Sequence, residues 1–188
     1  SLMQKLGAST SSATGGALLV EMGNAIALRN RFGYAGFESL MNDAGRLLGT
    51  IAKDKAAARL SDNAFLVLAP GLNAVQIDAY ARTLRDGIGY HDFKVDQESL
   101  RLRCAIGHTA LSHGFADAGA VLAAAEEAVR SARELAIGIA AHVPPADLAP
   151  ATDGIAEALR ASLSGEADLI HLAFQPVVAV AGGEDAQF

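Results

Sequence analysis

Two short apolar segments joined by a polar turn constrain the fold of this chain more than any other feature of its sequence. Residues 56–58 are all alanine, residues 65–68 read Phe-Leu-Val-Leu, and a Ser-Asp-Asn turn at 61–63 lies between them. Serine, aspartate and asparagine tolerate the backbone geometry of a tight turn and form hydrogen bonds with it. The pattern therefore predicts a β-hairpin at about residues 56–69, and with it a protein built on a sheet.

Apolar periodicity on both sides of this hairpin predicts helices that pack on the sheet. Apolar residues three and four positions apart mark one face of a helix. Asn24 is placed to cap a first helix that Gly33 would end, and Asn73 is placed to open a later one. This order of elements predicts an α/β sandwich, with a central, mostly antiparallel sheet flanked by helices. The expected segments are a loop at 8–16, helices at 24–31, 36–53, 73–88 and 117–135, and strands at 17–22, 100–106 and within 136–142.

The composition is that of an acidic protein with a sizeable core. The chain has 188 residues, of which 51% are hydrophobic, and a formal net charge of −6 without any cluster of lysine and arginine. A nucleic-acid partner is therefore not expected, because phosphate binding needs concentrated positive charge. The longest apolar runs fall far short of the roughly 20 residues that span a bilayer, so no membrane contact is expected in this segment. The single cysteine, Cys104, is expected to be a buried, unreactive side chain, which fits a reducing, cytoplasmic compartment.

A proline-rich stretch predicts a domain boundary. Three prolines fall within residues 142–152, and such a stretch forms a stiff linker. We therefore expect one domain at 1–142, a linker at 143–152, and the beginning of a second domain at 153–188.

The hairpin segment resembles the signature of a known enzyme family. Arg59, Leu60 and Phe65 match the Arg-Leu-Gly-Gly-Asp/Glu-Glu-Phe sequence of the GGDEF family, the diguanylate cyclases. The resemblance covers about residues 17–135 and implies a nucleotide-cyclase, palm-like fold. Further segments resemble family motifs in the family's order: 20–24 its Ile-Asp-Ile-Asp-Asn, 32–38 its Tyr-Gly-His with a later acid, 105–107 its Ser-Ile-Gly, and 125–133 its Ala-Asp-x-Ala-Leu helix.

The residues that carry the family's chemistry are replaced in this hairpin. Ser61 and Asp62 stand where the family has two glycines, and Asn63 and Ala64 stand where it has two acids, just before Phe65. The resemblance implies a reaction between two GTP molecules on facing domains, with divalent metal ions bound by anionic oxygens. Because Asn63 is uncharged and Ala64 has no ligand atom, we expect no catalytic residue, no metal and no cofactor.

Three residues would form what remains of a nucleotide site. In the resemblance, Glu21 holds the position of the first-strand acid, Arg29 replaces the asparagine that reads guanine, and Glu38 replaces its acidic partner. Glu21 also has a plain explanation as a solvated strand-end acid, and Glu38 as a first-turn helix acid. An alternative hypothesis therefore stays open: a non-catalytic domain that binds GTP with Mg²⁺ and so tunes a neighbouring domain. A surviving cyclase is the third hypothesis.

The end of the chain resembles a second family. Residues 172–178, Leu-Ala-Phe-Gln-Pro-Val-Val, resemble the Tyr-Gln-Pro-Ile-Val opening of the EAL family, the cyclic di-GMP phosphodiesterases. The two resemblances together imply a catalytically inactive, regulatory GGDEF-like domain followed by an EAL domain in cyclic di-GMP signalling. The expected partners are that EAL domain and either a second copy of the chain or another signalling protein.

Overall fold

The computed structural model describes residues 4, 6–7, 14–53 and 55–144. The chain divides into two units after Pro144, so most of the predicted linker and all of the predicted EAL-like segment lie outside the described residues. The elements are β1 (Gly15–Met22), α2 (Ala25–Ala52), β2 (Ala56–Arg59), β3 (Ala64–Pro70), α3 (Ala74–Gly89), β4 (Phe93–Val95), β5 (Glu98–Leu100), β6 (Cys104–Ala110), a 3₁₀ turn (Leu111–His113), α4 (Ala118–Glu134) and β7 (Ile139–Ala141).

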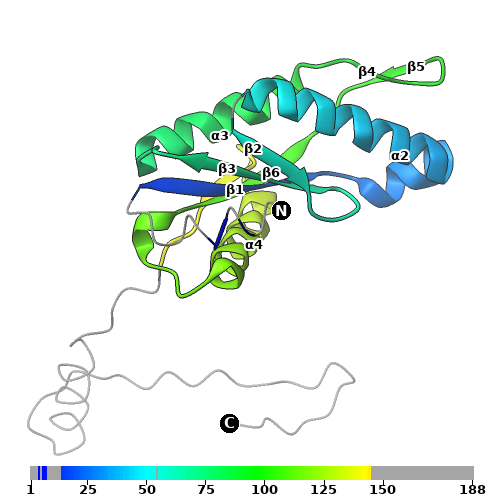
Figure 1. Ribbon diagram of the computed structural model, residues 1–188. Helices are drawn as coiled ribbons and strands as arrows, with labels where there is room; N and C mark the ends of the chain where they lie inside the picture. The colour runs from blue at the N-terminus through cyan, green and yellow to red at the C-terminus, as the bar shows by residue number, and fades with distance from the viewer. Residues whose placement is uncertain (1–3, 5, 8–13, 54, 145–188) are drawn as a thin grey trace, which may run out of the picture. The chain divides into compact units, whose positions relative to one another are not determined.

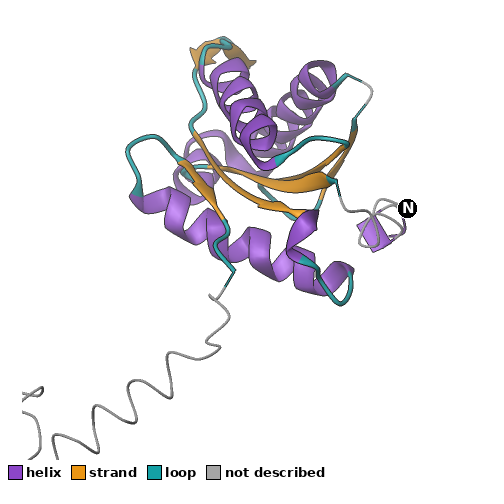
Figure 2. Ribbon diagram, turned by 90° about the vertical axis from the view of Figure 1, so that its left-hand side faces the viewer, coloured by secondary structure: helices purple, strands orange, loops and turns teal. Residues whose placement is uncertain are grey.

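The main sheet has five strands in the order β2-β3-β1-β6-β7. Neighbouring strands are antiparallel, except that β6 and β7 are parallel. Helices α2 and α3 cover one face of the sheet and α4 covers the other (Figure 1, Figure 2). Strands β4 and β5 form a separate two-stranded hairpin. The predicted α/β sandwich with a mostly antiparallel sheet is confirmed.

Strand β1 lies in the middle of the sheet and is buried on both faces. Leu18 and Val20 belong to the core formed with α2 and α3, whereas Leu19 packs with residues of α4. Because both faces are covered, the strand has a continuous apolar sequence instead of alternating with polar residues. This strand ends beside the hairpin and so positions the candidate site.

The strand begins earlier than predicted, which shortens the expected loop at 8–16. Gly16 already belongs to β1 and pairs with Ala69 and Ala110. A Cβ atom at position 16 would lie 2.5 Å from Cδ1 of Ile77. The glycine is therefore needed for the close approach of α3 to the sheet, not for loop flexibility.

The two helices predicted at 24–31 and 36–53 form one kinked element, α2. Gly33 interrupts its helical geometry with φ 68° and ψ −178°, so the predicted break at this glycine is confirmed. Asn24 directly precedes the helix as predicted, but it does not cap the helix with its side chain: its backbone is left-handed and its side chain makes no capping hydrogen bond. Its carbonyl oxygen instead accepts a hydrogen bond from the Leu28 amide.

The later helices begin as the sequence predicts. Asn73 and Gln76 form a capping box at the start of α3, with each side chain accepting a hydrogen bond from the other residue's backbone amide. The carboxylate of Asp117 caps α4 by accepting from the Ala120 amide. Both caps satisfy amides that have no partner within the helix.

The strand predicted at 100–106 is wrong in its bounds. Strand β6 runs from Cys104 to Ala110, and residues 101–103 form no strand. From Ile106 onward β6 is buried, because it lies between β1 and β7 with helices on both faces. Such a strand does not alternate, so the alternation at 100–106 placed it too early. The short edge strand within 136–142 is confirmed as β7.

Among the described residues, no helix combines the length and the apolar character that crossing a membrane requires.

Candidate functional site

The hairpin of β2 and β3 lies at the end of the sheet where β1 also ends. Strand β2 pairs with β3 from Ala56↔Leu68 to Arg59↔Phe65, which confirms the predicted hairpin. The Leu60 and Ser61 amides both donate to the carbonyl oxygen of Ala64, at 2.8 and 3.3 Å, and these bonds close the turn. The turn of the hairpin and the end of β1 therefore lie side by side.

Asn63 attaches this turn to β1. Its side-chain amide donates to the backbone carbonyl oxygen of Met22 at 2.7 Å. The backbone carbonyl oxygen of Asn63 in turn accepts from the backbone amide of Met22 at 2.8 Å. One residue further, Ala64 pairs with Glu21 in the ladder between β1 and β3. Asn63 thus holds a position that in the resemblance belongs to an acid, and its side chain is engaged in a structural hydrogen bond.

Glu38 forms a bidentate ion pair with Arg59. The two guanidinium nitrogens of Arg59 donate to the two carboxylate oxygens of Glu38 at 2.8 and 2.9 Å, and the side chains of Arg59 and Glu38 are 28% and 31% exposed. Arg59 also donates to the carbonyl oxygens of Ser61 and Asp62 in the turn. The hydrogen bond from Arg59 lowers the pKa of Glu38, and the same bond raises the pKa of Arg59. Glu38 is therefore ionised, and both of its oxygens are occupied.

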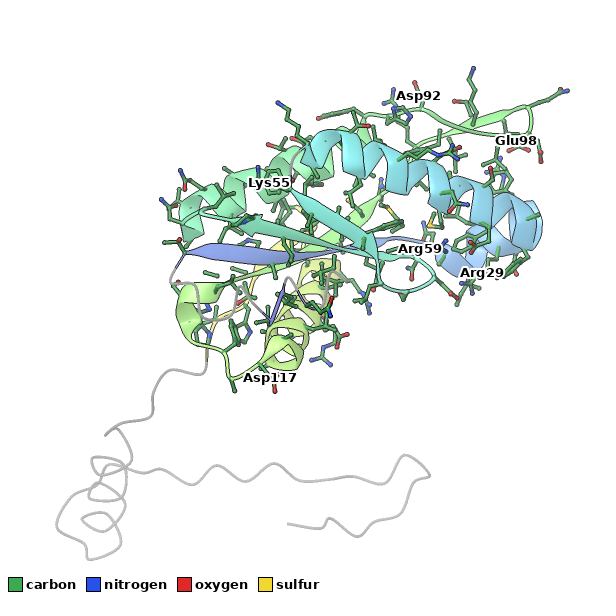
Figure 3. The ribbon with its side chains drawn as sticks, viewed as in Figure 1. Arg29, Lys55, Arg59, Asp92, Glu98 and Asp117 are labelled. Carbon is green, nitrogen blue, oxygen red and sulfur yellow. The ribbon has the colours of Figure 1, made fainter. Side chains whose placement is uncertain are left out.

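Arg29 joins the beginning of α2 to the hairpin turn. Its guanidinium donates to the carboxylate of Asp62 at 2.5 Å and lies over the ring of Phe37, 4.6 Å from the ring centroid. Figure 3 shows Arg29 and Arg59 beside the loop between β2 and β3. Arg29, which in the resemblance replaces the asparagine that reads guanine, therefore connects helix α2 to the turn.

Glu21 forms the third ion pair of this region. Arg133, near the end of α4, donates to both of its carboxylate oxygens, at 2.9 and 2.5 Å. Helix α4 packs on β1 and β6, which places Arg133 across from the end of β1. The sequence alone did not identify Arg133 as a site residue, and it identified Arg59 only as part of the hairpin motif.

The side chains of Ala64 and Phe65 provide no ligand for a cation. The methyl group of Ala64 is buried, and Phe65 is a core residue whose ring lies 3.0 Å from where a Cβ of Gly45 would be. Within the described part of the chain, no group of three or more His, Cys, Asp or Glu residues is placed to hold a metal ion. Divalent cations require several anionic or carbonyl oxygens, so this end of the sheet does not fit the metal pair of a cyclase.

Solved structures with the same fold are described as GGDEF domains or proteins that contain them. The GGDEF domain of FimX from Pseudomonas aeruginosa is 21% identical, with a TM-score of 0.65 over 74% of this chain and 87% of that chain. The GGDEF domain of DgcB from Caulobacter crescentus, solved in complex with c-di-GMP, is 14% identical, with a TM-score of 0.68 over 75% and 85%. An EAL/GGDEF domain protein from M. capsulatus is 18% identical, with a TM-score of 0.68 over 76% and 94%.

These similarities establish that the chain has the GGDEF-domain fold, which is the fold of diguanylate cyclases. No protein-family model and no curated protein matches the sequence. The fold implied by the hairpin motif is thereby confirmed, although overall identity to these structures is low.

Proposed function

We propose that this chain is a catalytically silent GGDEF-fold domain that acts by interaction, regulating or positioning an adjacent EAL domain in a cyclic di-GMP signalling protein of the cytoplasm. The GGDEF fold supports the signalling context. Similarity to an EAL/GGDEF domain protein supports the EAL partner, together with the EAL-like sequence at 172–178. A homodimer or another signalling protein is the further partner that we propose for this role.

One observation carries the proposal: every carboxylate of the candidate site is paired with an arginine of the same chain. Glu21 binds Arg133, Glu38 binds Arg59, and Asp62 binds Arg29. The other positions, Asn63 and Ala64, carry no charge. A guanidinium brings positive charge to a carboxylate without the open coordination positions of a metal ion, so these pairs do not replace its chemistry.

The missing hairpin acids should lower the rate of phosphoryl transfer strongly. Cyclic di-GMP formation is a phosphoryl transfer that depends on cations to neutralise the triphosphate. Removing one such electrostatic element from a site of this kind costs about 10²–10³ in rate, and this chain lacks both hairpin acids. Asp62 adds a further negative charge at the turn where the family has glycine. We therefore expect no turnover of GTP.

A direct assay of the intact chain tests this proposal. The chain is incubated with GTP and Mg²⁺, cyclic di-GMP is measured by mass spectrometry, and heat of binding is measured by calorimetry. We expect neither product nor heat. Formation of cyclic di-GMP that disappears in Glu21→Ala would overturn the proposal, because Glu21 is the only family metal acid that remains. Ser99→Ala, on β5, is the matched control.

The alternative is a non-catalytic GTP sensor that tunes the EAL domain. The observation that favours it is the ionised, half-buried carboxylate of Glu38, which retains the acidic character of the guanine-binding position. This alternative predicts a Kd for GTP tighter than about 100 μM, which calorimetry detects readily. It also predicts that Glu38→Gln weakens GTP binding while Asp43→Asn, on the same helix, does not.

A further inference from the structure

A large groove lies between the C-terminal ends of α3 and α4, next to the start of β6. Its volume is about 990 Å³, and it is lined by the end of α3, residues 101–105, the last residues of α4 (132–134) and the loop 135–138 before β7. The Glu21–Arg133 pair borders it on one side, but the hairpin residues do not line it. Gly23, which follows β1, also lines it, so the groove adjoins the candidate site and extends from it over the ends of α3 and α4.

Three large apolar side chains are exposed around this groove. Tyr90 at the end of α3 is 73% exposed, and Leu135 and Ile137 in the loop after α4 are 48% and 37% exposed. Exposed apolar side chains that gather at one place mark interaction sites, whereas single ones are ordinary. Tyrosine in particular supplies contact area at a low cost in conformational entropy.

The loop that carries two of these side chains has a fixed backbone. The amide of Leu135 donates to Ala132 at 3.2 Å, and the amide of Gly138 donates to Leu135 at 2.9 Å. Gly138 has φ 66°, and its carbonyl oxygen accepts from the Ile106 amide, which ties the loop to the sheet. Leu135 and Ile137 are thus presented on a pre-organised turn, which reduces the entropy lost on binding.

Four arginines and no lysine line the same groove. Two of them have structural roles: Arg85 binds Asp86 and the carbonyl oxygen of Ile137, and Arg133 binds Glu21. Arg133 also lies in the last turn of α4, where it balances the partial negative charge of the last carbonyl groups. The other two arginines, which precede β6, remain available to a partner.

Arg101 and Arg103 are the available pair. Among the described residues, Arg101 forms an ion pair with Asp92 alone, and both of these side chains are well exposed, so that contact is weak and exchangeable. Neither Arg103 nor Glu134 makes a side-chain hydrogen bond or ion pair with any other described residue. Asp86 is already neutralised by Arg85, so Glu134 is the one unpaired acid in the described lining.

We propose that this groove docks an acidic segment of a partner protein, which inserts an apolar side chain beside Tyr90 and places carboxylates on Arg101 and Arg103. Tyrosine and arginine are the residues enriched at the energetic centres of protein interfaces, and lysine is depleted there. Arginine also binds carboxylates in a bidentate manner. This inference deepens the proposed interaction function and rests on it, because it names the surface and the chemistry of the partner.

Fluorescence anisotropy of labelled peptides with the intact chain tests the inference. The probe is a 12-residue peptide of three Glu-Leu-Asp-Phe repeats, and the control peptide has lysine at every acidic position. We expect the acidic peptide to bind and the basic one not to bind. Raising the salt concentration should weaken binding, because exposed charges contribute.

Single substitutions locate the binding. Arg103→Glu should weaken the acidic peptide by about tenfold or more, and Tyr90→Ala by a similar factor with little change in salt dependence. Glu134→Gln should strengthen binding by roughly twofold to threefold, since it removes a like charge. Arg46 lies on α2 outside the groove and forms an ion pair with Asp43, so Arg46→Glu is the matched charge reversal and should leave affinity unchanged.

Three results would overturn the inference: no binding of the acidic peptide, equal binding of both peptides, or unchanged affinity in Arg103→Glu. Sedimentation velocity tests the other occupant, a second copy of the chain. A dimer that dissociates in Tyr90→Ala would assign the groove to self-association instead of an acidic partner. Failure of the proposed function is recognised separately, by GTP turnover, which does not involve the peptide.

Discussion

The packing of α4 against β6 predicts that Gly107→Ala destabilises the domain. A Cβ atom at position 107 would lie 2.2 Å from the amide nitrogen of Val129, 2.5 Å from the carbonyl oxygen of Ala125 and 2.7 Å from the carbonyl carbon of Ala128. Favourable contacts between heavy atoms lie at about 3.5–4.0 Å, so α4 would have to move away by about 1 Å.

The size of the destabilisation depends on the atoms that a Cβ at position 107 would meet. Overpacking a close-packed core costs about 1–3 kcal/mol, and the obstructing atoms here belong to a helix backbone, which yields less than the end of a side chain. We therefore expect a loss of about 3 kcal/mol in the free energy of unfolding, equivalent to roughly 6–12 °C in Tm for a chain of this size. Because α4 carries Arg133, its displacement would also lengthen the contact with Glu21.

Urea unfolding followed by circular dichroism measures this loss. Gly49→Ala on α2 is the matched control, because a Cβ there meets no atom within 4 Å. Alanine is the better helix former, so this control should gain about 0.5–1 kcal/mol. If Gly107→Ala unfolds within about 0.5 kcal/mol of the parent chain, the close approach of α4 to β6 is refuted.

Four further predictions test separate parts of the structure. Burial raises the pKa of the Cys104 thiol to about 12, so at pH 8 its alkylation by iodoacetamide should be about a thousandfold slower than that of an exposed thiol. Burial lowers the pKa of His108 below 6.5, so the folded chain binds fewer protons than the unfolded chain, and stability should fall as the pH drops below about 6.5. In His108→Gln this part of the pH dependence of urea unfolding should disappear, whereas His91→Gln, at an exposed position, should retain it. Asn73→Ala removes one half of the capping box and should cost about 1 kcal/mol, measured by thermal unfolding against Asn42→Ala on the exposed side of α2. Thermal unfolding with 1 mM GTP and Mg²⁺ should show the same Tm as without them, whereas a site with a Kd of about 10 μM would add about 2.7 kcal/mol.

Much of the fold follows from local sequence, because its signals lie within single elements. The hairpin at 56–69 depends on a polar turn between apolar segments, and the start of α3 depends on Asn73 with Gln76 three residues later. The bounds of β6 were misplaced because burial on both faces removes the alternation that marks a strand. The cap at Asn24 failed because its backbone adopts a left-handed conformation, which the residue type permits but does not specify.

The sequence predicted only some of the residues of the candidate site. Glu21, Arg29 and Glu38 were identified as residual positions, and the structure places each in an ion pair. Their partners depend on tertiary placement: Glu21 and Arg133 are 112 residues apart and meet only because α4 packs across β1. No local pattern encodes such a contact, so sequence reasoning found the acids and missed Arg133.

The three ion pairs also explain how the carboxylates at this end of the sheet are stabilised. Carboxylates gathered without counter-charge repel one another and raise one another's pKa, which a metal-dependent enzyme avoids by binding its ion. Here Arg29, Arg59 and Arg133 supply the counter-charge from within the chain. A sensor needs two states that differ in ligand affinity, whereas a docking module needs one state that persists without ligand. Carboxylates that are each paired with an arginine of the same chain favour the second behaviour, which agrees with the interaction function that we propose.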